Sequence, residues 1–469
     1  KQTFLLLAVV GALVGCASKP QPLGRQAAEE KFPRLAAENG ESAPPYDAEW
    51  ASDFGDPRLI ELIEITLNDN PDAAAAAARL RAAGATSRIV GADRLPSVSA
   101  EAFGSRGRSV NKIDFPGVGE TLQTSTDNRF ELGLRMSWEI DLWGRIADAR
   151  QAALFEEQAA ASDLAATRLA LSTNVARAWF EASARILQAR LAEKQLEVAE
   201  KSLRATEDRV NRGLIGSLEL SLARSQVESA ESTLESAVRT RGNAIRQVQT
   251  LSGRYPDGNL PVPEELPKLT DPPPAAIPSS VLTRRPDLLA ASARISAADS
   301  RVSEAEKNLI PTVSLSGNLG TASDELSDLL DSDFTVWNLA GNLLQPVFQG
   351  GRLRAEVERR EALLAASISD FESALLTALR EEEDTMDSDA YLRQAAESAY
   401  ESARHAQEAA TVGFDRYERG LIDLLDVLDL QNRAFDAYRR AIDLRLLSLT
   451  NRLNLYAALG GGFQPESES

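Results

Sequence analysis

Residues 129–145 read RFELGLRMSWEIDLWGR, and this stretch decides the fold. From Arg129 to Ile140, apolar and polar side chains alternate without a break, which is the period of a β-strand. Its length matches a tilted membrane-crossing strand of about 9–11 residues, although a half-buried strand of a soluble sandwich would alternate in the same way. The Gly144-Arg145 pair then opens a segment without Pro or Gly that extends to Arg209. Such a segment predicts one long helix.

The chain contains an internal duplication. The motif Arg209-x-x-Arg212-Gly213-Leu214-Ile215 returns as Arg416-x-x-Arg419-Gly420-Leu421-Ile422, at an offset of 207 residues. Three further matches follow the same order along the chain, which chance would not preserve. Because two of these matches have an offset of 215 residues, we expect an eight-residue difference (215 minus 207) in a loop between Pro96 and Gly144. The further matches pair Asn70-Pro71-Asp72 with Arg285-Pro286-Asp287, Leu95–Ser99 with Ile310–Ser314, and Gly144-Arg145 with Gly351-Arg352.

Each half is expected to contain a helix, two strands separated by a polar loop, a long helix, a turn at Arg-Gly-Leu-Ile and a returning helix. The halves occupy residues 56–252 and 278–460. Between them, residues 253–277 are rich in Pro, which predicts an extended linker because Pro cannot continue a helix. Residues 461–469 form a C-terminal tail.

Four strands per chain are predicted, and four strands cannot close a membrane barrel. An open edge in lipid would leave backbone amides without partners, so strands that enter a membrane require several chains to share one barrel. Three chains would give twelve strands, although this count does not itself select three. Besides Arg129–Ile140, the strands are indicated by Val98, Ala100 and Ala102, by Val313, Leu315 and Leu319, and by Trp337, Leu339 and Leu343.

Very long helices are predicted after Arg145 and Arg352. Each covers 64 residues, or roughly 96 Å at about 1.5 Å per residue. Apolar residues recur at spacings of three and four, which is typical of a coiled coil. We refer to these positions as the seam; Arg185, Thr206 and Arg241 interrupt it. The seam includes Leu171, Val175, Ala178, Ala182, Ala189, Ala192, Leu196, Ala199 and Leu203, and it continues after the turn with Leu220, Ala223, Val227, Ala230, Leu234, Ala237, Ala244 and Val248.

The N-terminus has the pattern of a bacterial secretion signal. Lys1 precedes an apolar run without acidic residues, so residues 1–15 are predicted to be a signal peptide. The string Leu13-Val14-Gly15-Cys16 resembles a lipobox, in which the Cys carries the lipid. Cys16 is the only Cys in the chain; the alternative is a signal peptide with an unrelated Cys. Residues 16–55 are then expected to be a lipid-anchored, extended segment at the outer membrane.

The composition excludes several classes of function. The chain has 51 Lys and Arg against 70 Asp and Glu, a formal net charge of −19, so it would repel nucleic acid. One Cys closes no internal disulfide and one His builds no multi-His metal site. No phosphate-binding glycine loop or nucleophile elbow occurs. We therefore expect no enzyme, no cofactor and no metal.

Acidic residues follow the second turn. Asp423, Asp426 and Asp429 recur every three residues, which keeps them near one helical face. In a single chain such a face is simply solvated. Around the axis of a symmetric oligomer, each residue becomes a ring of like charge that can select cations and gate a pore. Glu219 follows Gly213 as Asp426 follows Gly420.

Several segments together resemble the TolC-type outer-membrane factors, in the lipoprotein branch of resistance–nodulation–division efflux systems. The resemblance covers almost all of the chain after Cys16. It rests on Trp138–Arg145, Arg284–Leu288, Pro346–Arg352, Asp423–Asp429 and the closing Leu455–Gly462.

The resemblance implies a fold that is mainly α with membrane β. It implies a homotrimer with a twelve-stranded outer-membrane β-barrel, a long antiparallel coiled-coil α-barrel, and an equatorial region that includes the linker. Tyr417 matches the family's gate tyrosine, Asp426 and Asp429 match its paired acidic rings, and Glu219 matches a first-half acidic partner. The chain departs from the best-known members at Ile422, where they carry an Arg.

The implied function is that of a passive exit duct for small molecules in a tripartite efflux pump. A periplasmic adaptor (membrane-fusion) protein and an inner-membrane pump are the implied partners, besides outer-membrane lipid. The turns at Arg212, Gly213, Leu214 and Ile215 and at Arg419, Gly420, Leu421 and Ile422 resemble adaptor-contact motifs. A type I protein-secretion duct and a non-pore periplasmic coiled-coil scaffold are the alternatives.

Overall fold

The computed structural model describes residues 50–115, 119–269 and 284–461, and side chains outside 113–121 within them. The predictions for Cys16, for residues 1–49 and for linker residues 270–277 concern segments outside the described residues and stay predictions. The chain divides into two compact units: Arg81–Gln158 belongs with Ser292–Ser369, whereas Ala159–Ala291 belongs with Asp370–Ser469 and Arg25–Leu80. Each unit therefore combines segments from both halves of the duplication.

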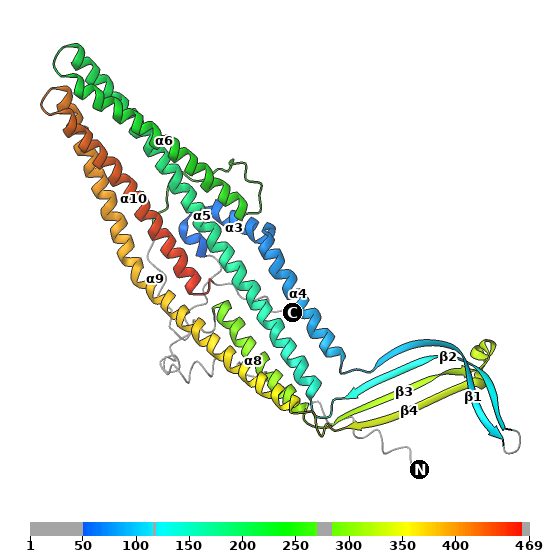
Figure 1. The fold of residues 1–469 in the computed structure, drawn as a ribbon. Coiled ribbons are helices and arrows are strands. Elements are labelled where there is room, and N and C mark those ends of the chain that lie inside the picture. Colours follow the sequence, from blue (N-terminus) through cyan, green and yellow to red (C-terminus); the bar gives the residue numbers. More distant parts are fainter. Residues whose placement is uncertain (1–49, 116–118, 270–283, 462–469) are drawn as a thin grey trace, which may run out of the picture. The chain divides into compact units, whose positions relative to one another are not determined.

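The first unit contains one antiparallel sheet of four strands in the order β1-β2-β3-β4 (Figure 1). The predicted strands are confirmed. Within the described residues, β1 and β4 pair along one side only, so the sheet of a single chain stays open at both edges. The strands are β1 (Ser97–Phe115), β2 (Gly119–Ile140), β3 (Thr312–Ser323) and β4 (Thr335–Leu344).

The first-half strands are longer than predicted. β1 and β2 pair from Ser97↔Ser137 to Phe115↔Gly119, so the expected polar loop between them is wrong: most of it is strand. The ladder forms through backbone N–H and C=O groups, so polar side chains do not end it. The additional residues of the first half therefore lie in this longer β1–β2 hairpin. β3 and β4 are joined instead through two short 3-10 helices, η2 (Leu326–Leu330) and η3 (Ser332–Phe334).

One face of the sheet carries an apolar row across all four strands. Ala100 lies opposite Leu134, Leu134 opposite Leu319, and Leu319 opposite Trp337. Leu134, Leu319 and Trp337 expose 51%, 55% and 75% of their surface in the single chain. Because side chains alternate between faces, this row belongs to the apolar face predicted from Arg129–Ile140.

The Trp-Glu-Ile-Asp-Leu-Trp-Gly-Arg segment forms the junction between β2 and α5 (Arg145–Asn211). The Asp141 carboxylate accepts hydrogen bonds from the backbone N–H groups of Ile146 (3.1 Å) and Ala147 (2.8 Å). This satisfies amides that a helix start leaves open. Gly144 turns the chain at φ 78°, and Arg145 pairs with Glu139 at 2.8 Å.

The long helices match between the halves residue for residue. α5 and α9 (Arg352–Glu418) each have 67 residues, and α6 (Ser217–Leu251) and α10 (Leu424–Ala458) each have 35 (Figure 1). Each pair of helices is related by the offset of 207. The remaining helices are η1 (Trp50–Phe54), α3 (Pro57–Asp69), α4 (Pro71–Ala92) and α8 (Pro286–Lys307).

The second unit has a hydrophobic core beside η1. The ring of Phe54 lies 5.0 Å from that of Phe180, and Trp50 stacks on Tyr456 at 5.7 Å. Seam residues such as Val175 are fully buried, which confirms the predicted pattern. Thr206, expected to interrupt the seam, is also fully buried, because its hydroxyl finds hydrogen-bond partners there.

A buried ion pair crosses this unit between α9 and α10. Arg452 donates to both carboxylate oxygens of Asp389 at 3.0 Å, and both side chains are almost fully buried. Asn451 beside it donates to the Thr385 carbonyl at 2.9 Å. The two parallel hydrogen bonds between guanidinium and carboxylate offset the free-energy cost of removing both charges from water.

Candidate functional site

The two Arg-Gly-Leu-Ile turns have the same backbone geometry. Gly213 has φ 69°, its N–H donates to the Val210 carbonyl (2.9 Å), and the Leu214 N–H donates to the Arg209 carbonyl (2.9 Å). This is the Schellman arrangement, which needs a left-handed residue just past the helix and so favours Gly. The first turn therefore ends α5 by a mechanism that the sequence specifies locally.

The second turn repeats this arrangement at the end of α9. Gly420 has φ 74°, its N–H donates to the Tyr417 carbonyl (2.8 Å), and Leu421 donates to the Arg416 carbonyl (2.9 Å). Each turn exposes leucines at matching positions, so each presents an apolar patch that no described residue covers. Their exposed fractions are 63% for Leu214, 68% for Leu218, 68% for Leu421 and 63% for Leu425.

The basic residues of the turns lie at the surface. Arg212 pairs with Asp208 and Arg419 pairs with Asp415, each at 2.9 Å across one helical turn. Exposed pairs of this kind contribute little to stability. Ile215 and Ile422 are half-buried, so the two turns expose their leucines and arginines and cover their isoleucines.

The predicted acidic face exists on α10. Asp423, Asp426 and Asp429 are all exposed. Asp429 pairs with Arg433 at 2.7 Å, whereas Asp423 and Asp426 have no ion pair among the described residues. Glu219, their first-half counterpart, lies half-buried in the first turn of α6. In one chain, therefore, only part of this charge is neutralised.

Tyr417 is not a surface residue: only 1% of it is exposed. Its hydroxyl lies 3.0 Å from the Thr206 hydroxyl of α5. Thr206 donates its own proton to the Ser202 carbonyl (2.7 Å), so the Tyr417 hydroxyl donates to Thr206. We call Thr206, Arg209, Phe414 and Tyr417 the Tyr417 cluster.

Arg209 joins α5 to α9 twice within this cluster. Its Nη1 donates to the Tyr417 carbonyl at 2.7 Å, and its guanidinium lies 4.6 Å from the centre of the Tyr417 ring. The first contact occupies a carbonyl near a helix C-terminus, where a cation is favoured; the second is a cation–π contact. Its counterpart in the duplication, Arg416, is exposed, so the two halves use this position differently.

Apolar residues of α10 cover the cluster from a third side. Leu424, Val427 and Leu428 are buried against Phe414 and Tyr417, and Ile422 packs on the same core. Gly413 lets α10 come close, since a Cβ there would lie 2.5 Å from Leu430 Cδ1. Ile422 therefore supplies packing at the position where the resemblance leads us to expect an Arg.

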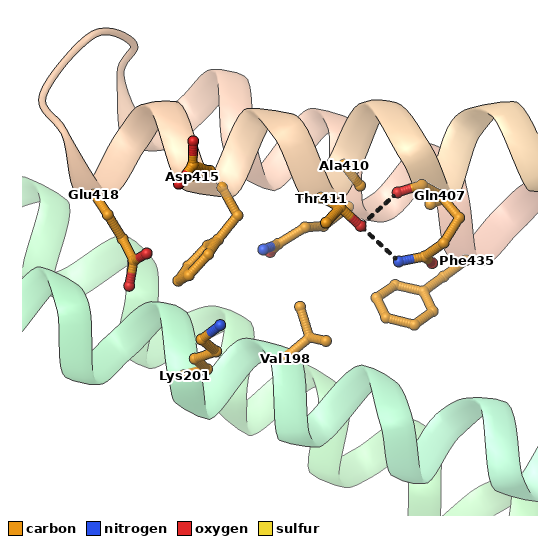
Figure 2. A pocket seen from close by; sticks show the side chains of 11 residues that line it. Val198, Lys201, Gln407, Ala410, Thr411, Asp415, Glu418 and Phe435 are labelled. Carbon is orange, nitrogen blue, oxygen red and sulfur yellow. Dashed lines mark hydrogen bonds between the residues drawn. The ribbon is translucent and has the colours of Figure 1, made fainter.

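A groove of about 290 Å³ lies beside the cluster between α5, α9 and α10. Figure 2 shows Val198 and Lys201 of α5 facing Asp415 and Glu418 of α9, with Phe435 at the other end. The Lys201 ammonium lies 4.4 Å from the centre of the Phe414 ring. Two cations of α5 thus cover two aromatic rings of α9.

Sequence reasoning missed Thr206 and Arg209 as contacts of Tyr417. The available signals were Thr206 as a polar residue on the seam and Arg209 as the first residue of the repeated turn motif. Among the described residues, no group of three or more His, Cys, Asp or Glu side chains could hold a metal ion.

The family model of outer membrane efflux proteins matches residues 62–254 and 277–461. The chain belongs to this family. The two matched segments show that the family's domain occurs twice, in agreement with the duplication found in the sequence.

Relatives agree along nearly the whole chain. This chain is 33% identical to the pyoverdine export outer membrane protein OpmQ of Pseudomonas aeruginosa over 459 residues. The alignment covers 97% of this chain and 96% of OpmQ. It is 27% identical to the probable outer membrane lipoprotein SilC of Salmonella typhimurium, covering 99% of each chain.

Solved structures agree in fold. The outer-membrane channel OprN superposes with a TM-score of 0.81 at 27% identity, covering 91% of this chain and 95% of that chain. The open-state Neisseria gonorrhoeae MtrE outer membrane channel superposes with a TM-score of 0.77 at 27% identity, covering 92% and 96%. Both of these neighbours are outer-membrane channels.

These findings confirm the expected family, fold class and location. The chain is an outer-membrane exit duct of an efflux system, mainly helical with a small antiparallel sheet. The predicted efflux channel is thus confirmed. Its family is one of transport channels.

Proposed function

We propose that three copies of this chain form one duct, in which their sheets close a barrel of twelve strands. The open edges at β1 and β4 support this, because an unpaired edge in lipid is too costly to persist. The exposed row of Leu134, Leu319 and Trp337 supplies the apolar outer face that a membrane barrel needs. The number three is the one that the resemblance to the TolC-type outer-membrane factors implies.

The helix turns carry the gate in this proposal. Around the trimer axis, Asp423, Asp426 and Asp429 form rings of like charge at the ends of α10, with Glu219 as the first-half acid. Such rings attract cations and raise the cost of a narrow, poorly hydrated opening. Asp423 and Asp426 support this best, since they are exposed without an ion pair among the described residues.

The Tyr417 cluster holds the closed state within each chain. Opening requires α9 and α10 to move relative to α5, and the contacts of Tyr417 and Arg209 oppose that movement. This assignment explains how the chain closes with Ile422 in place of Arg: the tie comes from α5, and Ile422 packs behind it.

The exposed leucines of the two turns are the surface for a periplasmic adaptor protein. Leu214 and Leu421 stand beside Arg212 and Arg419, so each turn offers an apolar centre with a polar rim. The adaptor connects the duct to an inner-membrane pump, which supplies the energy. The proposal keeps the domain boundaries given in the sequence analysis. A lipid at Cys16 would anchor each chain to the outer membrane.

The cargo is a small organic molecule. OpmQ of Pseudomonas aeruginosa is named for pyoverdine export, and TtgF of Pseudomonas putida, 29% identical, is named for toluene efflux. The cargo passes through a hydrated duct without any reaction with the chain. In this proposal the pump therefore selects the cargo.

Conductance in planar bilayers tests the acidic rings. Asp426→Ala combined with Asp429→Ala should raise conductance and weaken block by divalent cations. Asp436→Ala on the same helix is the matched control, because it removes an exposed acid that the proposal places outside the rings. Unchanged conductance and cation selectivity in the double variant would remove the ring assignment.

A further inference from the structure

A basic segment stands out in this acidic chain. Residues 236–256 contain four arginines and no Asp, Glu or Lys, although the chain as a whole carries a net charge of −19. Three of them, Arg239, Arg241 and Arg246, line one groove of about 600 Å³ between α6 and the described part of the linker. Arg241 is also one of the residues that interrupt the seam.

The duplication shows that the helix itself does not require these arginines. At the offset of 207, α10 carries Leu446, Ser448 and Leu453 in their place. Ser448 and Leu453 are buried there, and Leu446 packs against the core. Where the second half has residues in or against its core, the first half therefore has cations that border an open groove.

The acidic residues of the groove are already engaged elsewhere. Asp257 accepts hydrogen bonds from the Asn259 N–H (2.8 Å) and from Gln249 Nε2 (2.6 Å), which lower the pKa of its carboxyl. Glu264 pairs with Arg190. Among the described residues, neither Arg239 nor Arg241 has an ion pair, so the groove keeps an excess of positive charge.

Much of the rest of the lining is apolar. Ile186, Val238, Leu260 and Val262 contribute to the walls. The Arg246 guanidinium lies between two glycines, with its nitrogens 3.4 Å from a Cβ built at Gly242 and 3.5 Å from one built at Gly258. Its Nη2 donates to Asn243 Oδ1 at 2.7 Å, which fixes its position.

We propose that this groove binds an acidic peptide segment of a periplasmic partner protein, through carboxylates set between apolar side chains. Guanidinium groups pair with carboxylates in a planar, two-point geometry. The apolar walls favour a peptide over a purely polar anionic glycan, because they would leave the glycan's hydroxyls facing hydrocarbon. The site is separate from the leucines of the helix turns.

The test uses full-length protein purified in detergent and a fluorescein-labelled peptide of alternating Glu and Leu. Fluorescence anisotropy should show binding that weakens with added salt, and an otherwise identical Gln-Leu peptide should not bind. Arg239→Gln with Arg246→Gln should weaken binding about tenfold. Arg254→Gln removes the fourth arginine, outside the groove lining, and should change affinity less than twofold.

Circular dichroism and migration of the oligomer in SDS establish that each variant is folded. The proposal is overturned if the wild-type protein fails to bind the Glu-Leu peptide, if the Gln-Leu peptide binds equally, or if the double variant keeps full affinity. Isolated peptidoglycan sacculi form a second arm. If they retain the wild-type protein and release the double variant while the peptide does not bind, the ligand is cell wall and not a protein segment.

Discussion

The hydroxyls of Thr206 and Tyr417 lie 3.0 Å apart, although 211 residues separate them in the sequence. Thr206 belongs to the first half of the duplication and Tyr417 to the second. This one hydrogen bond therefore ties the two helical pairs together beside their turns, where the proposed duct would open.

Removing that hydrogen bond should favour opening. Tyr417→Phe keeps the ring in the core and deletes only the hydroxyl. We therefore expect the closed state to lose about 1 kcal/mol of stability relative to the open state, and the open probability to rise roughly fivefold. Single-channel recording measures this directly. Tyr400→Phe on the same helix, where the side chain is exposed, should leave the open probability unchanged, and a similar rise in both variants would contradict the assignment.

Arg209 and Arg416 form a matched pair for a second experiment. They occupy equivalent positions in the duplication, but the Arg209 guanidinium donates to the Tyr417 carbonyl and lies over its ring, whereas Arg416 is exposed. Arg209→Gln should destabilise the closed state by about 1–2 kcal/mol, because a hydrogen bond from a charged group is lost together with a cation–π contact. Arg416→Gln should have little effect on conductance. Equal effects would show that net charge, and not the contact, controls the gate.

Breaking the buried ion pair of Arg452 and Asp389 should strongly destabilise the packing of α9 against α10. Arg452→Met leaves a buried carboxylate whose remaining ion pair among the described residues is with Arg393, at 3.3 Å, and should cost about 3–5 kcal/mol. Thermal unfolding followed by circular dichroism checks this. Adding Asp389→Leu should restore much of the loss, since a well-packed apolar pair replaces the charges. A double variant less stable than Arg452→Met alone would refute this explanation.

Glu382 should make stability depend on pH. Burial, with a smaller contribution from Glu383, raises the pKa of its carboxyl from the ordinary 4.5 to about 7, while Arg285 opposes the shift. The folded state thus holds this proton more tightly than the unfolded state does. Glu382 therefore lowers stability as pH rises from about 4.5 to about 7, and has no further effect above that range.

Melting temperatures measured across this range test the assignment. Glu382→Gln should be less sensitive to pH between about 4.5 and 7 than the wild type. Glu361→Gln, at an exposed position of the same helix, should retain the wild-type pH dependence. If both variants behave like the wild type, Glu382 titrates in its ordinary range.

The sequence determined those features that depend on local physics and on repetition. Alternation in Arg129–Ile140 predicted a strand, and the absence of helix breakers from Arg145 to Arg209 predicted a long helix, which in the structure continues to Asn211. Gly213 and Gly420 marked the turns, since the left-handed backbone there favours Gly. The duplication predicted that both halves would contain the same elements, because equal sequence patterns bury equal faces.

Tertiary structure alone decided which polar residues became buried and which partners they found. Thr206 looked like a break in an apolar seam, yet the Tyr417 hydroxyl makes its burial favourable. Arg209 and Arg416 share one motif, and only packing distinguishes the cation that holds Tyr417 from the exposed one. The polar stretch between the first two strands extended the hairpin, because backbone hydrogen bonds, and not side-chain polarity, maintain a β-ladder.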